Sequence, residues 1–561
     1  MISFATKRGR AIEWTGTAIV FVIALRYWLW YFDRNANLLD EGSTAAQALR
    51  VFNGELIYRD FFTVVTPGSY YTVAWLFHLF GPGLMVLRWA ALVTGMGILL
   101  VTLVIARRVM TWPFAAAAAL MTTVWGWFLV TPNFYSLQAG LFALIALWCY
   151  LRYADTGATR WILIAGIITG LTALVKQNIG AYAALAIVAS TWLSRIFGDP
   201  PASRLRQGFG AQEAGGYTTG MFVAGICIPV VPTLLLLMLA GAGPYLYESW
   251  VYYPLARYPE RFAVPYPSFF EPLSEHGVFE RWVRYVIYLP VVVYPLTAIA
   301  LVRAREHRHA VMAIGLMGLL LLLQSWPRAD VPHILFGLQP TFILFAYLLY
   351  LGAGGYIGSH IGSHIRVAIA LTPLLVLLWQ GYQRTDWEYA NYVGQLNSDR
   401  GRGVATVPID AQRINLVTQY IRGNTEPGDP IFVVPWAAGF YFLTDRPNPT
   451  RTDFMLFEDP EMYPCLLARL EERRPRYVIY GYTWDVDNIR FREYAAPVDA
   501  YIRSRYAIED EVDGYEVWRR IDATGGAANT WAGACRPRRF RWSDWFGGAA
   551  ETASSPARSV Q

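Results

Sequence analysis

Long apolar stretches alternate with short charged connections along the first two-thirds of the chain. A membrane core about 30 Å thick is crossed by roughly 20 apolar helical residues. The pattern predicts eleven spanning helices, at residues 14–32, 84–106, 113–131, 134–151, 161–175, 179–197, 218–240, 283–302, 310–326, 332–351 and 366–382. We therefore expect a polytopic α-helical membrane protein.

Two connections between the predicted spans are long, at 33–83 and at 241–281. In the first, Gly42–Phe52 has the pattern of a short helix. Gly68–Phe80 is aromatic and too short to span, so we expect it to lie along the membrane surface. The second connection is rich in Pro and Tyr, which predicts an irregular lid.

Beyond residue 382 the chain becomes more charged, and strand-like runs alternate with helix-like runs. Helices are predicted at Gln412–Arg422, Glu461–Arg473 and Ala496–Tyr506, and strands at Pro430–Pro435, Tyr477–Tyr480 and Tyr515–Arg519. This alternation indicates a small α/β domain at 383–520, after a membrane module at 1–382. The Gly/Ala/Ser-rich, basic tail at 521–561 has the composition of a disordered segment.

The placement of charge gives the spans a direction. Only 16% of the residues are charged, and the net charge is +6. Arginines are concentrated in alternate connections, which hold Arg107, Arg108, Arg152, Arg160, Arg195, Arg204, Arg206, Arg303, Arg305, Arg308 and Arg366. The positive-inside rule makes these connections cytoplasmic, so the N-terminus lies inside and the C-terminal domain is exported. The basic excess then reflects topology and does not indicate a nucleic-acid partner.

The most specific candidate for chemistry is Asp40-Glu41, directly after the first span. Two carboxylates at a membrane boundary cost free energy unless they are solvated or used. The alternative is structural, because Asp40 or Ser43 could cap the helix that follows.

A second cluster, WPRADVPH, places Arg328, Asp330 and His333 on a short turn between two spans. Arg328 and His333 could bind a phosphate, or Arg328 could simply pair with Asp330. Lys176 ends another span on the same side and could reach either an anionic headgroup or the membrane interface.

Further candidates lie in the first long connection, where Arg59, Asp60 and Tyr70 could contact a substrate. All the candidates share the exported face, so together they could form a pocket for a lipid whose headgroup carries a phosphate. The sequence holds no Cys/His spacing typical of a metal site and no extended set of carboxylates. We therefore expect no cofactor and have no support for a divalent metal.

Several segments resemble one known family. They are DEGSTAAQALRVFNGELIYRDFFTVVTPGSYYTVAWLFHLFG, LTALVKQNIGAY, WPRADVPHILFGLQP and PWAAGFYFLTDRPNPTRTDF. These segments are similar to the GT-C glycosyltransferases, in the bacterial branch related to protein O-mannosyltransferases and aminoarabinose transferases. The resemblance covers most of residues 14–460 and implies a GT-C fold in a bacterial plasma membrane.

The resemblance also implies a reaction, in which a sugar moves from a polyprenyl-phosphate donor to a lipid, glycan or protein acceptor on the exported face. Asp40 would be the catalytic base of an inverting transfer, with Glu41 as its partner. Arg328, His333 and Lys176 would bind the donor phosphate. One departure is that VTPGSYY stands where the aminoarabinose transferases have a Glu-Lys pair.

Two other function classes are weighed against this one. A transporter or flippase of a lipid-linked glycan usually has polar or broken helices at mid-membrane and repeated halves, and no such repeat is visible. A structural or sensory membrane protein would leave the Asp-Glu pair without a purpose.

Overall fold

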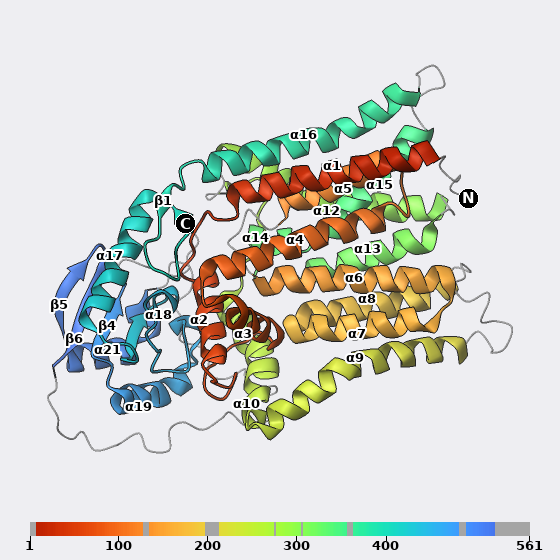
Figure 1. Cartoon of the computed structure of the whole chain (residues 1–561). Coiled ribbons are helices and arrows are strands. Elements are labelled where there is room, and N and C mark those ends of the chain that lie inside the picture. The colour runs from red at the N-terminus through yellow and green to blue at the C-terminus, as the bar shows by residue number, and fades with distance from the viewer. Residues whose placement is uncertain are drawn as a thin grey trace.

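The computed structural model describes residues 7–126, 134–196, 213–273, 277–303, 307–355, 363–481 and 490–521. A bundle of long helices makes up most of the molecule, and a smaller domain with a β-sheet lies at one end of it (Figure 1). The start of α1 and the C-terminal sheet lie at opposite ends of the bundle, as an odd number of crossings requires.

Each predicted span coincides with a helix of the bundle. The helices are α1 (Lys7–Tyr31), α4 (Leu84–Ala106), α5 (Trp112–Trp125), α6 (Phe134–Thr156), α7 (Thr159–Val175), α8 (Gln177–Ile196), α9 (Glu213–Leu239), α12 (Glu280–Arg303), α13 (Arg308–Leu322), α15 (Gln339–Gly355) and α16 (Ser363–Tyr389). Within the described ranges, seven are long and apolar enough to cross a membrane, namely α1, α4, α6, α9, α12, α13 and α16. Helices α5, α7 and α15 are shorter but also apolar. The predicted class, a polytopic helical membrane protein, is confirmed.

The predicted span 332–351 is wrong in one respect, because it is not continuous. A short helix, α14 (Val331–Leu335), precedes α15, and the 3-10 turn η4 (Leu323–Ser325) precedes α14. Proline accounts for the break, since Pro332 and Pro340 each lie in the first turn of a helix, where the missing N–H costs nothing. Residues 127–131 of another predicted span lie outside the described residues.

The first long connection forms two helices, α2 (Asp40–Phe52) and α3 (Gly68–Phe80), at the end of the bundle (Figure 1). A buried ion pair fixes α2 to α4. The guanidinium of Arg88 donates from Nε to Glu41 Oε1 at 2.7 Å and from Nη2 to Glu41 Oε2 at 2.6 Å. The same guanidinium donates to the carbonyl oxygens of Phe32, Arg34 and Asn35. It therefore ties together the end of α1, the turn after it and α2.

The second long connection, which its composition predicted to be an irregular lid, is helical in its first half and irregular at residues 263–273. It continues from α9 as α10 (Gly243–Tyr247), the π-helix η2 (Glu248–Arg257) and α11 (Tyr258–Phe262). Pro244 and Pro259 lie in the first turns of α10 and α11, so the prolines begin helices here and do not prevent them. A 3-10 turn, η3 (Gly277–Phe279), leads into α12.

The C-terminal part is an α/β domain, as predicted. Its main sheet has the order β3-β4-β6-β5, formed by β3 (Ile431–Val434), β4 (Tyr477–Tyr480), β5 (Tyr506–Val512) and β6 (Tyr515–Arg520). Only β3 and β4 are parallel, and a small second sheet pairs β1 (Gly394–Gln395) with β2 (Ala405–Thr406). The helices are α17 (Pro408–Asn424), α18 (Gly439–Thr444), α19 (Tyr463–Arg473), α20 (Phe491–Tyr494) and α21 (Ala496–Arg505), with 3-10 turns η5 (Met455–Phe457) and η6 (Pro460–Met462). Strand β5 was not predicted, because its run of exposed charged residues resembles a loop.

The two faces of the main sheet pack against different parts of the molecule. Phe432, Val434 and Val478 face α19 and α21. The alternate residues Ile431 and Val433 join the same apolar core as the membrane helices. The C-terminal domain is therefore packed onto the bundle and continuous with its core.

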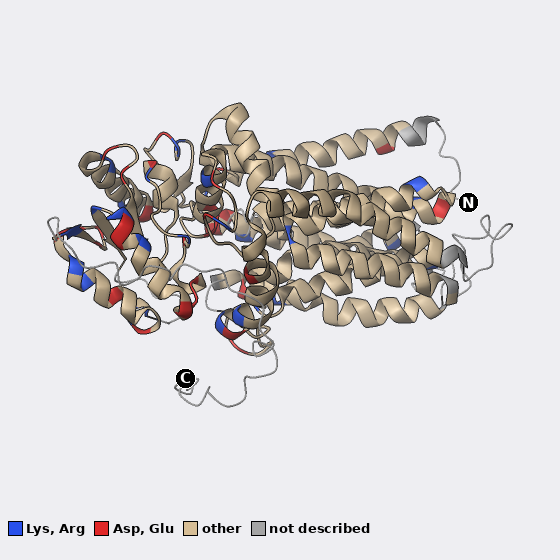
Figure 2. Cartoon of the chain, turned by 90° about the horizontal axis from the view of Figure 1, so that it is seen from below, with Lys and Arg blue, Asp and Glu red and all other residues tan. Residues whose placement is uncertain are grey.

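Charged side chains are concentrated in the C-terminal domain and the adjoining loops, whereas the membrane helices carry few along their length (Figure 2). This distribution matches a bundle in lipid with a water-exposed domain at one end. The predicted tail lies outside the described residues beyond Ile521.

The Glu41–Arg88 pair predicts a large effect on stability. In Arg88→Met the buried carboxylate of Glu41 loses its cation, which should lower the free energy of unfolding by about 3–5 kcal/mol. Thermal unfolding of the detergent-solubilised protein measures this loss. The control is Arg107→Met, since Arg107 pairs with the part-exposed Glu13 and should contribute less than about 1 kcal/mol.

A double variant, Glu41→Leu with Arg88→Met, removes both charges and should regain most of the lost stability. Equal unfolding temperatures for Arg88→Met and the Arg107 control would contradict the structural role of the pair.

Candidate functional site

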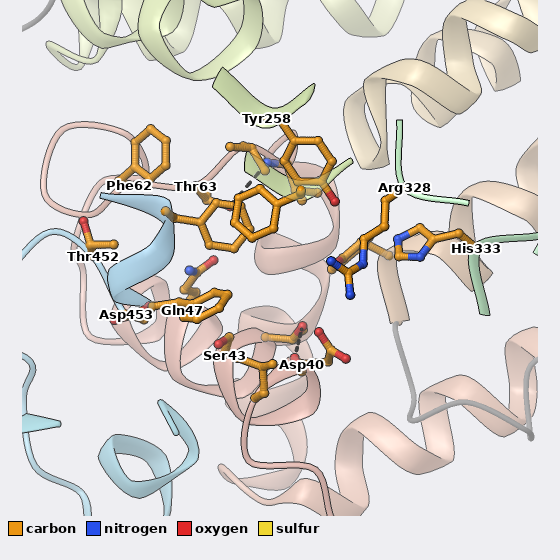
Figure 3. A pocket seen from close by; sticks show the side chains of 18 of the residues that line it. Asp40, Ser43, Gln47, Phe62, Thr63, Tyr258, Arg328, His333, Thr452 and Asp453 are labelled. Atoms are coloured by element: carbon orange, nitrogen blue, oxygen red, sulfur yellow. Dashed lines mark hydrogen bonds between the residues drawn. The ribbon is translucent and has the colours of Figure 1, made fainter. Parts of the chain in front are cut away.

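A cavity of about 250 Å³ lies where the first long connection, the second long connection and the C-terminal domain meet at the end of the bundle. Its walls come from α2 and the 62–70 segment, from α11, from the turn before α14, and from residues 452–457 (Figure 3). The cavity therefore draws on segments that are far apart in the sequence.

One face of α2 forms the floor of the cavity. Asp40, Ser43, Thr44 and Gln47 follow the i, i+3, i+4, i+7 spacing of a single helical face, and all four line the cavity. The helix is capped from outside the cavity, since Asn37 Oδ1 accepts hydrogen bonds from the backbone N–H groups of Leu39 and Asp40, each at 2.8 Å. The Asp40 carboxylate is thus not needed to cap α2, which was the structural role proposed as the alternative to a chemical one.

Asp40 and Arg328 extend towards one another across the cavity (Figure 3). Burial raises the pKa of the Asp40 carboxyl above its ordinary value, while the charges of His333 and Arg328 act in the opposite direction. A carboxylate in this environment accepts a proton more readily than an exposed aspartate does.

Asp330 contacts both Arg328 and His333. Its Oδ2 accepts from Arg328 Nε at 2.7 Å, and its Oδ1 lies 2.5 Å from His333 Nδ1. As the N-cap of α14 it also accepts from the backbone N–H of His333 at 3.1 Å. Burial raises its pKa, but the hydrogen bonds and charges of His333 and Arg328 outweigh burial and hold the pKa of Asp330 below its ordinary value. Arg328, Asp330 and His333 all line the cavity.

The turn that carries these residues is tied to the second long connection. Val264 pairs with Arg328 as an isolated β-bridge, in which Val264 N–H donates to Pro327 O at 3.0 Å and Ala329 N–H donates to Val264 O at 2.9 Å. The position of Arg328 therefore depends on the second long connection as well as on its own turn.

Lys176 lies behind the cavity and is not among the residues that line it. Its Nζ donates to Ser136 Oγ at 2.9 Å and to Gln324 Oε1 at 3.3 Å, and the amide of Gln324 donates to the carbonyl of His333. Burial lowers the pKa of Lys176 to about 8, against the opposing effect of the negative charge of Asp330. Lys176 thus supports the turn of His333 through Gln324.

The other predicted candidates divide into two groups. Tyr70 lines the cavity, and its hydroxyl lies 3.0 Å from Thr63 Oγ1. Arg59 and Asp60 pair with each other at 2.8 Å and do not line the cavity. Glu41 is also outside it, because its carboxylate is buried against Arg88.

An aromatic roof covers the cavity, and part of it comes from the second long connection, which the sequence predicted to be a lid. The contribution of Phe454 and Phe457 was not predicted. Tyr258 and Phe262 on α11 meet Phe454 and Phe457 from the C-terminal domain, with ring centroids 4.8 Å apart for Phe262 and Phe457. Arg261 Nη1 fastens this contact by donating to the carbonyl oxygens of Leu456 and Glu458.

Thr452, Asp453 and Gln47 are also wall residues that sequence reasoning missed. Thr452 and Asp453 fall inside a segment that carried the family resemblance, but nothing in that segment showed which of its polar residues faces a site. Among the residues that the structure describes, no group of three or more His, Cys, Asp or Glu side chains could hold a metal ion. The expectation of no metal or cofactor stays a prediction.

No protein-family model matches the chain, and no curated protein sequence matches it. Several solved structures, however, are similar to it in fold. ArnT from Cupriavidus metallidurans, bound to undecaprenyl phosphate, is 15% identical with a TM-score of 0.57, over 92% of this chain and 100% of that one.

Two archaeal structures are similar as well. The oligosaccharyltransferase AglB from Archaeoglobus fulgidus, in complex with an inhibitory peptide and a dolichol-phosphate, is 14% identical with a TM-score of 0.54, over 90% of this chain and 74% of that one. An Archaeoglobus fulgidus oligosaccharyltransferase with Zn and sulfate is 13% identical with a TM-score of 0.52, over 85% and 69% of the two chains. The chain therefore has the GT-C fold that these membrane enzymes share, as the sequence resemblance predicted.

Proposed function

We propose that this protein is a membrane glycosyltransferase that moves a sugar from a polyprenyl-phosphate donor to an acceptor in the cell envelope. The observation that carries the proposal is the cavity, in which a carboxyl group of raised pKa, Asp40, faces Arg328 and His333. The fold supports it, because the similar ArnT and AglB structures contain undecaprenyl phosphate and a dolichol-phosphate.

In the proposed reaction, the acceptor hydroxyl oxygen attacks the anomeric carbon of the sugar. Its proton passes to the carboxylate of Asp40, which acts as the general base. The bond between the anomeric carbon and the phosphate oxygen breaks, and the phosphate leaves with the electron pair. Attack from the face opposite the phosphate inverts the anomeric configuration.

Arg328 and His333 are proposed to stabilise the charge on the departing phosphate. The Arg328 Nε is engaged by Asp330, which orients the planar guanidinium. The same Asp330 is hydrogen-bonded to His333 Nδ1, which directs Nε2 of that ring away from Asp330. The guanidinium of Arg328, and the ring of His333 in its protonated form, are preorganised donors of the kind that stabilise developing charge without reorganising during the reaction.

Glu41, Asp330 and Lys176 then take positioning roles. Glu41 holds α2 against the bundle through Arg88, Asp330 orients Arg328 and His333, and Lys176 supports the turn of His333 through Gln324. We further propose that the N-terminus is cytoplasmic and that the cavity opens on the exported face of a bacterial plasma membrane. The arginine-rich connections support that orientation.

The location of the cavity favours an enzyme over a transporter of a lipid-linked glycan. Transporters bind their substrates near the middle of the membrane, between two halves of the helical bundle. Here the cavity is lined by α2, α11 and residues 452–457. Helix α2 lies at the end of the bundle that carries the C-terminal domain (Figure 1).

Asp40→Asn should reduce sugar transfer by about 10²–10⁴-fold, the usual contribution of a general base. Transfer of a radiolabelled sugar from a polyprenyl-phosphate donor panel to an envelope extract, by protein in nanodiscs, measures the loss. The matched control is Asp399→Asn, because Asp399 is exposed and does not line the cavity. Full activity of Asp40→Asn would exclude Asp40 as the base.

The same variant should be more stable than the native protein near neutral pH. The raised pKa means that the folded state binds the proton of Asp40 more tightly than the unfolded chain does. The ionised carboxylate therefore opposes folding, and this cost disappears as the pH falls through the raised pKa. Thermal unfolding at several pH values should show an advantage for Asp40→Asn that shrinks in acid. A lower unfolding temperature at neutral pH would contradict the burial argument.

Arg328→Lys should bind undecaprenyl phosphate about tenfold more weakly than the native protein, because lysine lacks the planar fork of the guanidinium. Titration of the lipid into purified protein measures the affinity. Arg59→Lys is the matched control, since Arg59 is a part-exposed arginine outside the cavity. Equal affinities for the two variants would remove Arg328 from the phosphate site.

A further inference from the structure

The end of the cavity away from Asp40 contains two buried acceptor atoms. Gln47 Oε1 and Asp453 Oδ2 have no hydrogen-bond partner among the described residues. Gln47 is 8% exposed and Asp453 is 4% exposed, and both line the cavity (Figure 3). Buried acceptors are normally satisfied, so two of them in one cavity indicate a ligand that supplies donors.

Asp453 is held firmly by its other oxygen. Its Oδ1 accepts from Asn448 Nδ2 at 2.7 Å, and Arg50 Nη1 lies 3.6 Å from the same atom. Arg50 is itself fixed, because its Nε donates to Glu55 at 2.7 Å and its other nitrogens donate to the carbonyl oxygens of Thr450 and Asp60. Oδ2 is therefore the part of this carboxylate that is left for a ligand.

The separation of Asp40 and Gln47 along α2 gives the distance between the two ends of the cavity. Gln47 follows Asp40 by seven residues on the same face of α2, which places it about 10 Å further along the helix axis. A phosphate and one sugar ring, arranged end to end, cover this length. Small-molecule sites usually enclose roughly 300–1,000 Å³, so a cavity of about 250 Å³ suits a single ring better than a longer glycan.

We propose that Gln47 and Asp453 form the subsite for the transferred sugar and accept hydrogen bonds from two of its hydroxyl groups. The proposal rests on the proposed function, since it takes the phosphate of the donor to lie at Arg328 and His333. It also selects a class of sugar, because hydroxyl groups are the donors that match one neutral and one anionic acceptor.

The charge of the sugar distinguishes a neutral sugar from a uronic acid and from an amino sugar at this subsite. A uronic acid would bring a second carboxylate to Asp453, and like charges in a buried site repel. An amino sugar would bring a cation to the carboxylate of Asp453, which already has a cation nearby, since Arg50 Nη1 lies 3.6 Å from its Oδ1. The subsite therefore favours a neutral, hydroxylated sugar.

Four lipid probes test the subsite on the full-length protein in nanodiscs. Three are undecaprenyl phosphate linked to a neutral hexose, to an amino pentose and to a uronic acid. The fourth is the methyl ester of undecaprenyl phosphate, which keeps the phosphodiester and lacks a sugar. Asp453→Asn keeps an oxygen for Asn448 and turns the second oxygen into a donor, while Gln47→Met removes the acceptor at nearly constant size.

We expect both variants to bind the hexose lipid about tenfold more weakly than the native protein and the methyl ester equally well. Asp399→Asn is the control, since Asp399 is exposed and does not line the cavity, and it should leave both affinities unchanged. Thermal unfolding of each variant verifies that it is folded.

The outcomes separate the two proposals. Hexose-lipid affinity that is unchanged in both variants, or tighter native binding of the amino or uronic lipid, overturns the subsite while the methyl ester still binds. Failure of every probe, the methyl ester included, to bind the native protein overturns the proposed function itself, and the subsite with it.

Discussion

The buried ion pair between Glu41 and Arg88 determines where the rest of the site can be. Both side chains are almost fully excluded from solvent, and every hydrogen bond that Arg88 makes is to the turn after α1 or to the first turn of α2. Two buried charges tolerate little displacement, because separating them leaves each one unpaired in an apolar surrounding. The start of α2 is therefore fixed against α4, and Asp40 is fixed with it.

This constraint explains why two adjacent carboxylates have different surroundings. Successive residues of a helix point about 100° apart, so when Glu41 faces the bundle, Asp40 faces the cavity. The sequence showed that Asp-Glu after the first span was unusual, but it could not distinguish the two residues. That distinction depends on Arg88, which is 47 positions further along the chain and looks like an ordinary interfacial arginine at the start of a span.

The features that the sequence predicted well depend on patterns within short stretches of the chain. Apolar runs set the eleven spans, and their bounds in the structure differ from the prediction mostly by a few residues. Arg328 and His333 were predicted because they share one short turn with Asp330. Gln47, Asp453 and the two roof residues Phe454 and Phe457 were missed, because their role exists only once α11 and the C-terminal domain lie over α2. Strand β5 was missed for the opposite reason, since its exposed face hides the alternation that marks a strand.

The roof and the turn that carries Arg328 and His333 are connected through the second long connection. Phe262 and Arg261 attach α11 to residues 454–458 of the C-terminal domain. Two residues after Phe262, Val264 forms the β-bridge to Arg328. A displacement of α11 that opened the roof to admit a lipid would therefore also move the backbone of Arg328. Closure of the roof would return Arg328 to its place facing Asp40, and it would exclude water at the same time, which strengthens every charge interaction in the cavity. In the proposed reaction, the second long connection would thus couple entry of the donor to the placement of Arg328.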